Sequence, residues 1–191
     1  MEKGRLEAFS DGVIAIIITI MVLELKAPHG ADLVALKPLA PVFLSYVLSF
    51  IYVAIYWTNH HHLLQAATRV TGPILMANLF LLFWLSMIPF ATGWMGENNF
   101  ARFPVQIYGA VLLASALAYS LLAWLLVRSE GPTSILGRAI GRDLKGKISL
   151  VLYLVGIAAS AINPALAMAT YVLVAVIWFV PDLRIERLFR G

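Results

Sequence analysis

Six long apolar stretches dominate this sequence, and they restrict the chain to a helical membrane protein. A helix needs about 20 mostly apolar residues to cross a bilayer. The stretches cover residues 5–25, 40–64, 73–95, 104–127, 147–162 and 164–180. Because 61% of the residues are hydrophobic and only 13% are charged, a soluble domain could not hide this much apolar surface. We predict an all-α integral membrane protein with about six transmembrane helices in one domain, residues 1–191.

Prolines and one short turn indicate where these helices bend or end. Pro28 follows the first stretch, and Pro89 predicts a kink near the outer end of the third. The last two stretches are short and are joined only by Asn163-Pro164, a turn signal that favours a tight hairpin. A kink at this turn, in place of the hairpin, would reduce the count to five spans.

The basic residues predict the orientation of the chain. Lys3 and Arg5 precede the uncharged apolar run of residues 12–23 as in a signal peptide, but three acidic residues in the same leader favour a retained helix. With a cytoplasmic N-terminus, eleven of the fourteen Lys and Arg residues lie on the cytoplasmic side. The other three are Lys26, Lys37 and Arg102. This bias predicts a multi-pass protein of the cell membrane with both termini in the cytoplasm.

Several kinds of chemistry are not expected. The chain has no cysteine, which excludes disulfides, thiolate catalysis and cysteine metal sites. The adjacent residues His60, His61 and His62 point in different directions on a helix, which is unfavourable for a metal site. Residues 141–147 imitate a phosphate-binding loop, but Ile148 stands where Ser or Thr is required. We expect no cofactor, no metal ion, no nucleic-acid partner and no enzymatic activity.

Asp11 is the most informative polar residue, because it opens an otherwise apolar helix. An ionisable side chain at membrane depth is costly and marks a functional site by default. The simpler alternative is that Ser10 and Asp11 only cap the helix at the headgroup level.

Depth matching favours a polar network over simple capping. The second helix returns to the side from which the first one started, and the third helix leaves from that side. Trp57, His60 and Asn78 are therefore expected at the depth of the first helix's polar end. Since buried polar groups need partners, we predict that Asp11 is a structural partner of groups such as His60 and Asn78.

One motif gives these residues a family context. The R-x-x-x-F-S-D motif is formed by Arg5, Phe9, Ser10 and Asp11. Followed by an apolar helix with one threonine, it resembles the transmembrane-protein-175 family of potassium channels. The resemblance extends over the first three predicted spans and includes Trp57, His60, Asn78, Pro89 and Phe90. One departure is His62, where a basic residue is common in the family.

The resemblance implies a central pore lined by the first helix of each subunit. Ile16 would form a hydrophobic constriction, with Thr19, Ile20 and Leu23 above it. The bracing network behind the helix would comprise Arg5, Ser10, Asp11, Trp57, His60 and Asn78. At 100° per residue the four pore positions share one stripe, but an Ile-Leu stripe alone is more often ordinary helix packing.

The function implied by the resemblance is a potassium-permeable cation channel in the lipid bilayer. One pore helix per subunit cannot enclose a path, so the chain is expected to self-associate, as a homotetramer by analogy with short family members. The sequence lacks T-V-G-Y-G, so any selectivity must arise at side chains. Glu24 either concentrates cations at the mouth or is simply a solvated end residue.

Two other interpretations remain open from the residues alone. In the first, the chain is a secondary transporter or a proton pathway in which Asp11 and His60 form a relay. In the second, it is a membrane enzyme or accessory protein with these residues in a cavity. Passive potassium flux through the purified protein would favour the channel, and flux that requires a proton gradient would favour the transporter.

The predicted topology can be tested with introduced cysteines. Asn98 precedes the fourth predicted span and Ser134 follows it, so Asn98→Cys and Ser134→Cys should react with an impermeant maleimide from opposite sides of the membrane. The chain has no native cysteine to interfere. Labelling of both positions from the same side would contradict the six-span topology.

Overall fold

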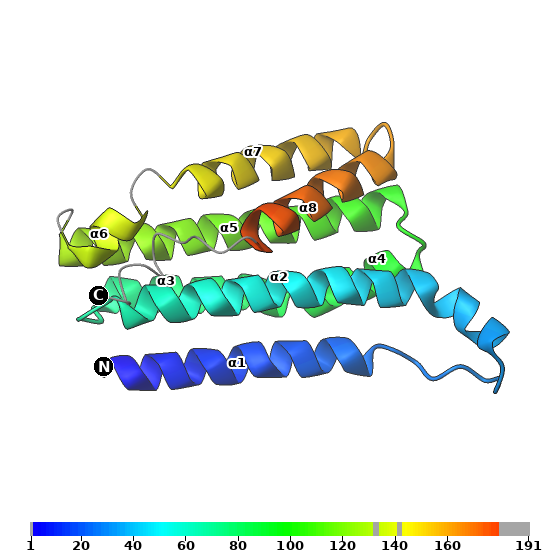
Figure 1. Ribbon diagram of the computed structural model, residues 1–191, viewed down its shortest axis with the longest axis horizontal. Coiled ribbons are helices and arrows are strands. Elements are labelled where there is room, and N and C mark those ends of the chain that lie inside the picture. The colour runs from blue at the N-terminus through cyan, green and yellow to red at the C-terminus, as the bar shows by residue number, and fades with distance from the viewer. Residues whose placement is uncertain (1, 132–133, 141–142, 180–191) are drawn as a thin grey trace.

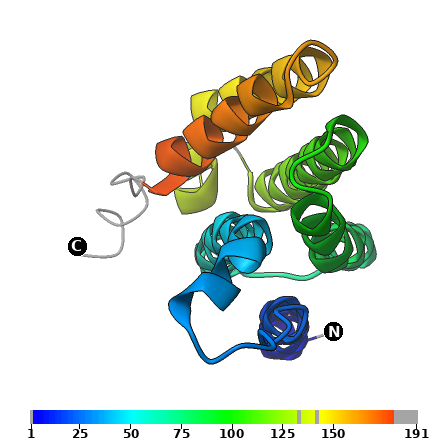
Figure 2. The same cartoon turned by 90° about the vertical axis from the view of Figure 1, so that its right-hand side faces the viewer.

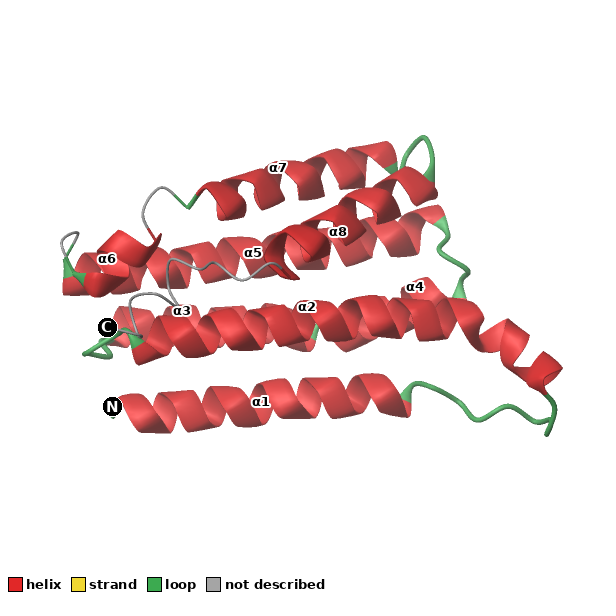
Figure 3. Cartoon of the chain, in the orientation of Figure 1, coloured by secondary structure: helices red, strands yellow, loops and turns green. Residues whose placement is uncertain are grey.

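The protein is a bundle of helices in the computed structural model, which describes residues 2–131, 134–140 and 143–179 (Figures 1 and 3). Every regular element in these ranges is helical, which confirms the all-α prediction. The elements are α1 (Lys3–Leu23), the 3-10 helix η1 (Leu33–Leu39), α2 (Ala40–Gln65), α3 (Gly72–Ser86), α4 (Ile88–Glu97), α5 (Arg102–Glu130), α6 (Ile135–Ile140), α7 (Leu144–Ala159) and α8 (Pro164–Phe179). Some residues used in the predictions lie outside the described ranges: Arg142, Val180, Arg184, Arg187 and Arg190.

Four helical stretches are long and apolar enough to cross a membrane: α1, η1 with α2, α3 with α4, and α5. The helices α7 and α8 have 16 residues each. At 1.5 Å per residue each is about 24 Å long, somewhat less than the ~30 Å hydrocarbon core of a bilayer. They occupy the fifth and sixth predicted stretches, and their crossing of the membrane stays a prediction.

The third predicted span is divided into two helices close to the expected kink. The break falls at Met87, which is the C-cap residue of α3 and the N-cap residue of α4. Pro89 cannot donate a hydrogen bond to the carbonyl of Leu85, and its ring crowds that carbonyl. The chain tightens there instead, and the Met87 N–H donates to the Trp84 carbonyl at 3.2 Å.

Helix-capping residues explain why two ends differ from the predicted bounds. α5 continues to Glu130 because it ends only at Gly131, whose φ of 93° stops the helix. α7 starts at Leu144 because the carboxylate of Asp143 accepts a hydrogen bond from the Gly146 N–H at 3.1 Å. The Asn163-Pro164 turn brings α8 back along α7 as a hairpin (Figure 1).

α1 lies at the edge of the bundle, and the other helices cover it on one side only (Figure 2). α5 occupies a more central position and contacts α3, α4 and α7. The loop between α2 and α3 is fixed to the end of α5, because the Glu130 carboxylate accepts hydrogen bonds from the Thr68 N–H at 2.7 Å and its hydroxyl at 2.9 Å. This contact ties α5 to the loop between α2 and α3, two of the helices that carry the residues described next.

Candidate functional site

A chain of buried hydrogen bonds joins α1, α2 and α3 near the N-terminal end of α1. His60 Nε2 lies 2.6 Å from Asn78 Oδ1, and Asn78 Nδ2 donates to Ser10 Oγ at 2.9 Å. The Ser10 hydroxyl in turn donates to the Leu6 carbonyl at 2.8 Å. Ser10, His60 and Asn78 are all fully buried. These hydrogen bonds therefore join one side chain from each of three helices at the same depth.

The donor and acceptor order of these hydrogen bonds determines which ring nitrogen of His60 carries the proton. Because the amide nitrogen of Asn78 donates to Ser10, its oxygen faces His60 and must accept. His60 therefore donates from Nε2 as the Nε2–H tautomer. Its Nδ1 is buried without a hydrogen-bond partner among the described residues, so the ring has no acceptor for a second proton.

Asp11 belongs to a separate pair. Trp57 Nε1 donates to Asp11 Oδ1 at 3.0 Å, whereas among the described residues Asp11 makes no hydrogen bond to His60 or Asn78, the pairing expected from the sequence. Arg5 is exposed, and in the described part of the chain its side chain has no hydrogen bond or ion pair. Five of the six proposed bracing residues therefore meet in two hydrogen-bonded groups, and Arg5 stands apart.

Two further contacts at this end were not anticipated from the sequence. Glu7 Oε1 lies 3.1 Å from His61 Nδ1. Lys3 Nζ donates to the carbonyls of Gln65 and Ala67 at the end of α2, both at 3.1 Å. The signal was present, because Lys3, Glu7 and Asp11 recur every fourth residue and so lie along the face that meets α2. No group of three or more His, Asp or Glu side chains suited to a metal ion occurs within the described ranges.

A second buried polar cluster ties α2 to α4 and α5 farther along the bundle. The Thr92 hydroxyl donates to Ser49 Oγ at 2.6 Å, and Ser49 Oγ lies 3.0 Å from Tyr108 Oη. Hydroxyl residues scattered among apolar ones gave no pattern from which this cluster could be predicted. It fixes the scaffold against which α1 packs.

The opposite face of α1 is uncovered. The side packed against the subunit consists of residues that are at most 2% exposed: Leu6, Ser10, Ile14, Ile17 and Met21. On the other side Ile16 is 58% exposed, Ile20 42% and Leu23 79%. Thr19 is also exposed, and its hydroxyl donates to the Ile16 carbonyl at 2.8 Å. The motif residue Phe9 continues this uncovered face toward the N-terminus.

A groove runs beside this face, between α1 and α4. It is lined by Val13, Ile16, Ile17, Ile20, Glu24, Ser86, Pro89, Phe90, Gly93, Trp94 and Glu97. Most of these side chains are apolar, and both acidic ones lie toward the C-terminal ends of their helices. The groove and the uncovered face together form a continuous apolar surface.

The long apolar helices, with buried hydrogen bonds between α1, α2 and α3, define a multi-pass helical membrane protein. Residues 5–89, which contain both these hydrogen bonds and the uncovered face, match the family model described as endosomal/lysosomal potassium channel TMEM175. A potassium channel from Chryseobacterium sp. (strain P1-3) is 56% identical over 187 residues, covering 98% of this chain and 97% of the relative. The chain therefore belongs to the TMEM175 family, as the sequence motif indicated, and it is a potassium or cation channel.

Other relatives differ in length and in the ion named. The crystal structure of a lysosomal potassium-selective channel TMEM175 homolog from Chamaesiphon minutus has a TM-score of 0.83 and 30% identity, covering 95% of this chain and 98% of that one. The endosomal/lysosomal proton channel TMEM175 of Gallus gallus is 34% identical over 91 residues, covering 41% of this chain and 18% of the relative. The similarity to the vertebrate protein is thus limited to part of each chain.

The buried hydrogen-bond chain makes a prediction about stability. Asn78→Ala leaves the donor of His60 and the hydroxyl of Ser10 without their partner, so it should lower the stability of the folded protein by about 1–3 kcal/mol. Thermal unfolding of the purified protein in detergent measures this change. Asn98→Ala is a matched control, since the Asn98 side chain is exposed and, among the described residues, bonds only to the Trp94 carbonyl of α4. Equal melting temperatures for the two variants would show that the hydrogen bonds of Asn78 do not hold the helices together.

Proposed function

We propose that four copies of this chain assemble around a central cation path, and that the uncovered face of α1 lines it. Ile16 forms the narrowest ring, and Thr19, Ile20 and Leu23 line the path beyond it. The groove between α1 and α4 receives the neighbouring subunit. The residues behind α1 hold its orientation and do not touch the ions.

The observation that carries this proposal is the one-sided burial of α1. The helix is apolar all round, yet Ile14 and Ile17 are 1% and 2% exposed while Ile16 is 58% exposed. One face of one helix cannot enclose a path by itself, so several copies must share the path, and closed rotational symmetry places like faces around one axis. The buried hydrogen bonds from Ser10 support the same orientation, because they direct the opposite face of α1 away from the scaffold.

A ring of isoleucine side chains controls ion passage by excluding water. When it is narrow, water leaves the constriction and ions lose their hydration, whereas a small widening restores both. The Thr19 hydroxyl is already satisfied by the backbone of its own helix, so it offers only a weak polar site above the ring. Selectivity for potassium then depends on side-chain packing at the constriction, since the chain has no T-V-G-Y-G segment.

The charges at the two ends of α1 fit a path for cations across the cell membrane. The basic residues favour a cytoplasmic N-terminus, which places Glu24 at the outer mouth. The carboxylate of Glu97 is paired with Lys26 at 3.2 Å, whereas Glu24 has no hydrogen bond or ion pair among the described residues. Glu24 is therefore the residue that concentrates cations at this mouth.

Proton permeation is a second candidate, favoured by the proton channels among the vertebrate relatives. A relay from Asp11 to His60 has little support from the geometry, because these side chains bond to Trp57 and Asn78 respectively. Protons would instead share the path along α1. A pH-sensitive dye trapped in liposomes that contain only the purified protein would measure proton entry separately from potassium efflux.

Ile16→Asn should open the constriction. A shorter and polar side chain keeps water in the ring, so potassium flux should rise about tenfold, which corresponds to a barrier lowered by about 1.4 kcal/mol. Discrimination between potassium and sodium should weaken at the same time. The measurement is passive efflux of each ion from liposomes that contain only the purified protein.

Ile18→Asn is the matched control for this change. Ile18 lies two residues farther along α1, about 160° away around the helix, and packs partly against the core. The Ile18→Asn variant should show lower expression or stability and no increase in potassium flux. If Ile18→Asn leaks while Ile16→Asn conducts like the unmodified protein, the assigned pore face is wrong.

A further inference from the structure

One face of α5 stays uncovered along the length of the helix, although the other side of α5 contacts several helices. Buried residues such as Tyr108, Ser115 and Leu122 recur every seven positions and face the bundle. At 100° per residue, Leu117 lies about 180° around the helix from Tyr108. The exposed residues with the same spacing form the α5 stripe, which is apolar except for its last member: Phe103, Ile107, Ala110, Leu117, Leu121, Trp124 and Arg128.

The length of the α5 stripe matches the apolar thickness of a bilayer. At 1.5 Å per residue, Phe103 and Trp124 lie about 32 Å apart along the helix, and the hydrocarbon core is ~30 Å thick. Each ring carries an arginine. The guanidinium carbon of Arg102 lies 5.7 Å from the centroid of the Phe103 ring, and that of Arg128 lies 5.3 Å from the Trp124 ring. Aromatic and basic residues are typical of both edges of the hydrocarbon region, so the stripe has the dimensions of a surface that lipid covers.

Arg128 carries a charge that the described part of the protein does not neutralise. Its side chain has no hydrogen bond or ion pair among the described residues. The carboxylate nearest in sequence belongs to Glu130, which points about 160° away around α5 and accepts hydrogen bonds from the N–H and hydroxyl of Thr68. The Trp124 ring supports one face of the guanidinium, which leaves the N–H groups at its edge free to donate. Paired N–H donors of this kind fit the oxygens of a phosphate.

We propose that Arg128 and Trp124 bind the phosphate of an anionic phospholipid, with one acyl chain lying along Leu117 and Leu121. The Trp124 Nε1 has no hydrogen-bond partner among the described residues, so it can donate to the same headgroup. A zwitterionic lipid is disfavoured, because its own ammonium group competes for the phosphate and is repelled by Arg128. The proposed orientation of the chain places this site in the cytoplasmic leaflet, but the site does not depend on the pore assignment.

Two lipids that differ only in the headgroup test the proposal. Dioleoylphosphatidylglycerol is anionic and dioleoylphosphatidylcholine is zwitterionic, whereas their acyl chains are the same. Native mass spectrometry of the full-length protein in detergent counts the bound lipids one at a time during a titration. The first phosphatidylglycerol should bind saturably and at a lower concentration than the first phosphatidylcholine. Equal affinity for the two lipids, or no saturable binding of phosphatidylglycerol, would overturn the proposal.

Variants on the α5 stripe locate the bound lipid. Arg128→Gln removes the charge and the paired donors, so it should weaken phosphatidylglycerol binding about tenfold and leave phosphatidylcholine binding unchanged. Arg128→Lys keeps the charge but loses the planar fork, and should restore only part of the affinity. Trp124→Leu removes the ring that supports the guanidinium and should also weaken binding. Both side chains are exposed, so these changes leave the packing of the bundle intact.

Lys147→Gln is the matched control, because it removes one charge near the same end of the bundle (Figure 1). Lys147 is exposed on α7, and no aromatic ring lies beneath its ammonium group among the described residues. This variant should bind phosphatidylglycerol about as tightly as the unmodified protein. An equal loss in Lys147→Gln and Arg128→Gln would mean that the lipid responds only to total charge. That result, or unchanged affinity in Arg128→Gln, would contradict a site at Arg128 and Trp124.

Discussion

The hydrogen bonds that run from Ser10 through Asn78 to His60 determine how α1 is rotated about its own axis. α1 is apolar on every side, so apolar packing alone would accept several rotations with similar energy. Hydrogen bonds are directional, and a buried donor left unpaired is costly in a membrane. With Ser10 directed at α3, Ile16 must point away from the subunit. The uncovered face that we propose as the pore lining is thus a consequence of a polar contact on the other side.

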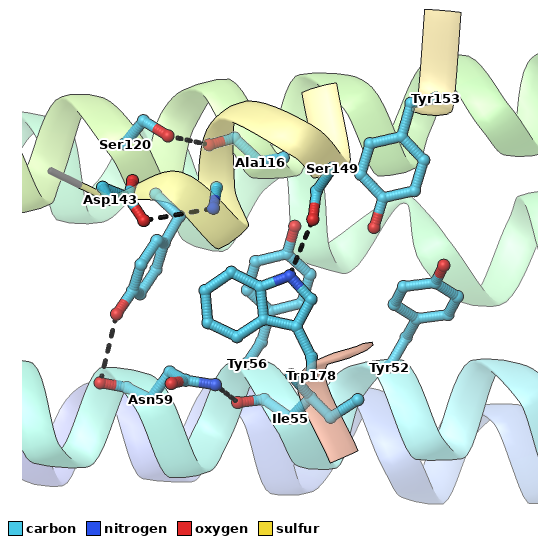
Figure 4. A pocket seen from close by; sticks show the side chains of 12 residues that line it. Tyr52, Ile55, Tyr56, Asn59, Ala116, Ser120, Asp143, Ser149, Tyr153 and Trp178 are labelled. Carbon is cyan, nitrogen blue, oxygen red and sulfur yellow. Dashed lines mark hydrogen bonds between the residues drawn. The ribbon is translucent and has the colours of Figure 1, made fainter. Parts of the chain in front are cut away.

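The remainder of the subunit is a scaffold built around α5. α5 packs against helices from both halves of the chain, and the cluster around Ser49 and Tyr108 joins it to α2. The hairpin of α7 and α8 lies on the side of the scaffold away from α1 (Figure 2). Its Tyr153 and Trp178 line a small cavity together with tyrosines of α2 and α5 (Figure 4). The proposed ion path lies along α1, whereas the hairpin of α7 and α8 packs against α5 and α2.

Much of the fold could be predicted from the sequence, because apolar length and the depth of polar residues are one-dimensional properties. The helical stretches and the meeting of polar residues from the first three helices followed from them. The partners did not, since they depend on helix rotation: Asp11 meets Trp57, not His60. The small cavity was also missed, because its rings come from four helices and each tyrosine looked like an ordinary apolar residue. The family resemblance supplied the role proposed for Ile16, which the residues alone could not distinguish from packing.

Accessibility of single cysteines on α1 tests the central claim most directly, that its uncovered face lines the cation path. Silver ions are close to potassium in size and bind thiolates, and the chain has no native cysteine. With currents recorded in planar bilayers, silver should block channels that carry cysteine in place of Ile16 or Leu23. It should leave those with cysteine in place of Ile14 or Met21 unaffected, because these positions are buried in the subunit. Block at the buried positions and none at the uncovered ones would contradict the account.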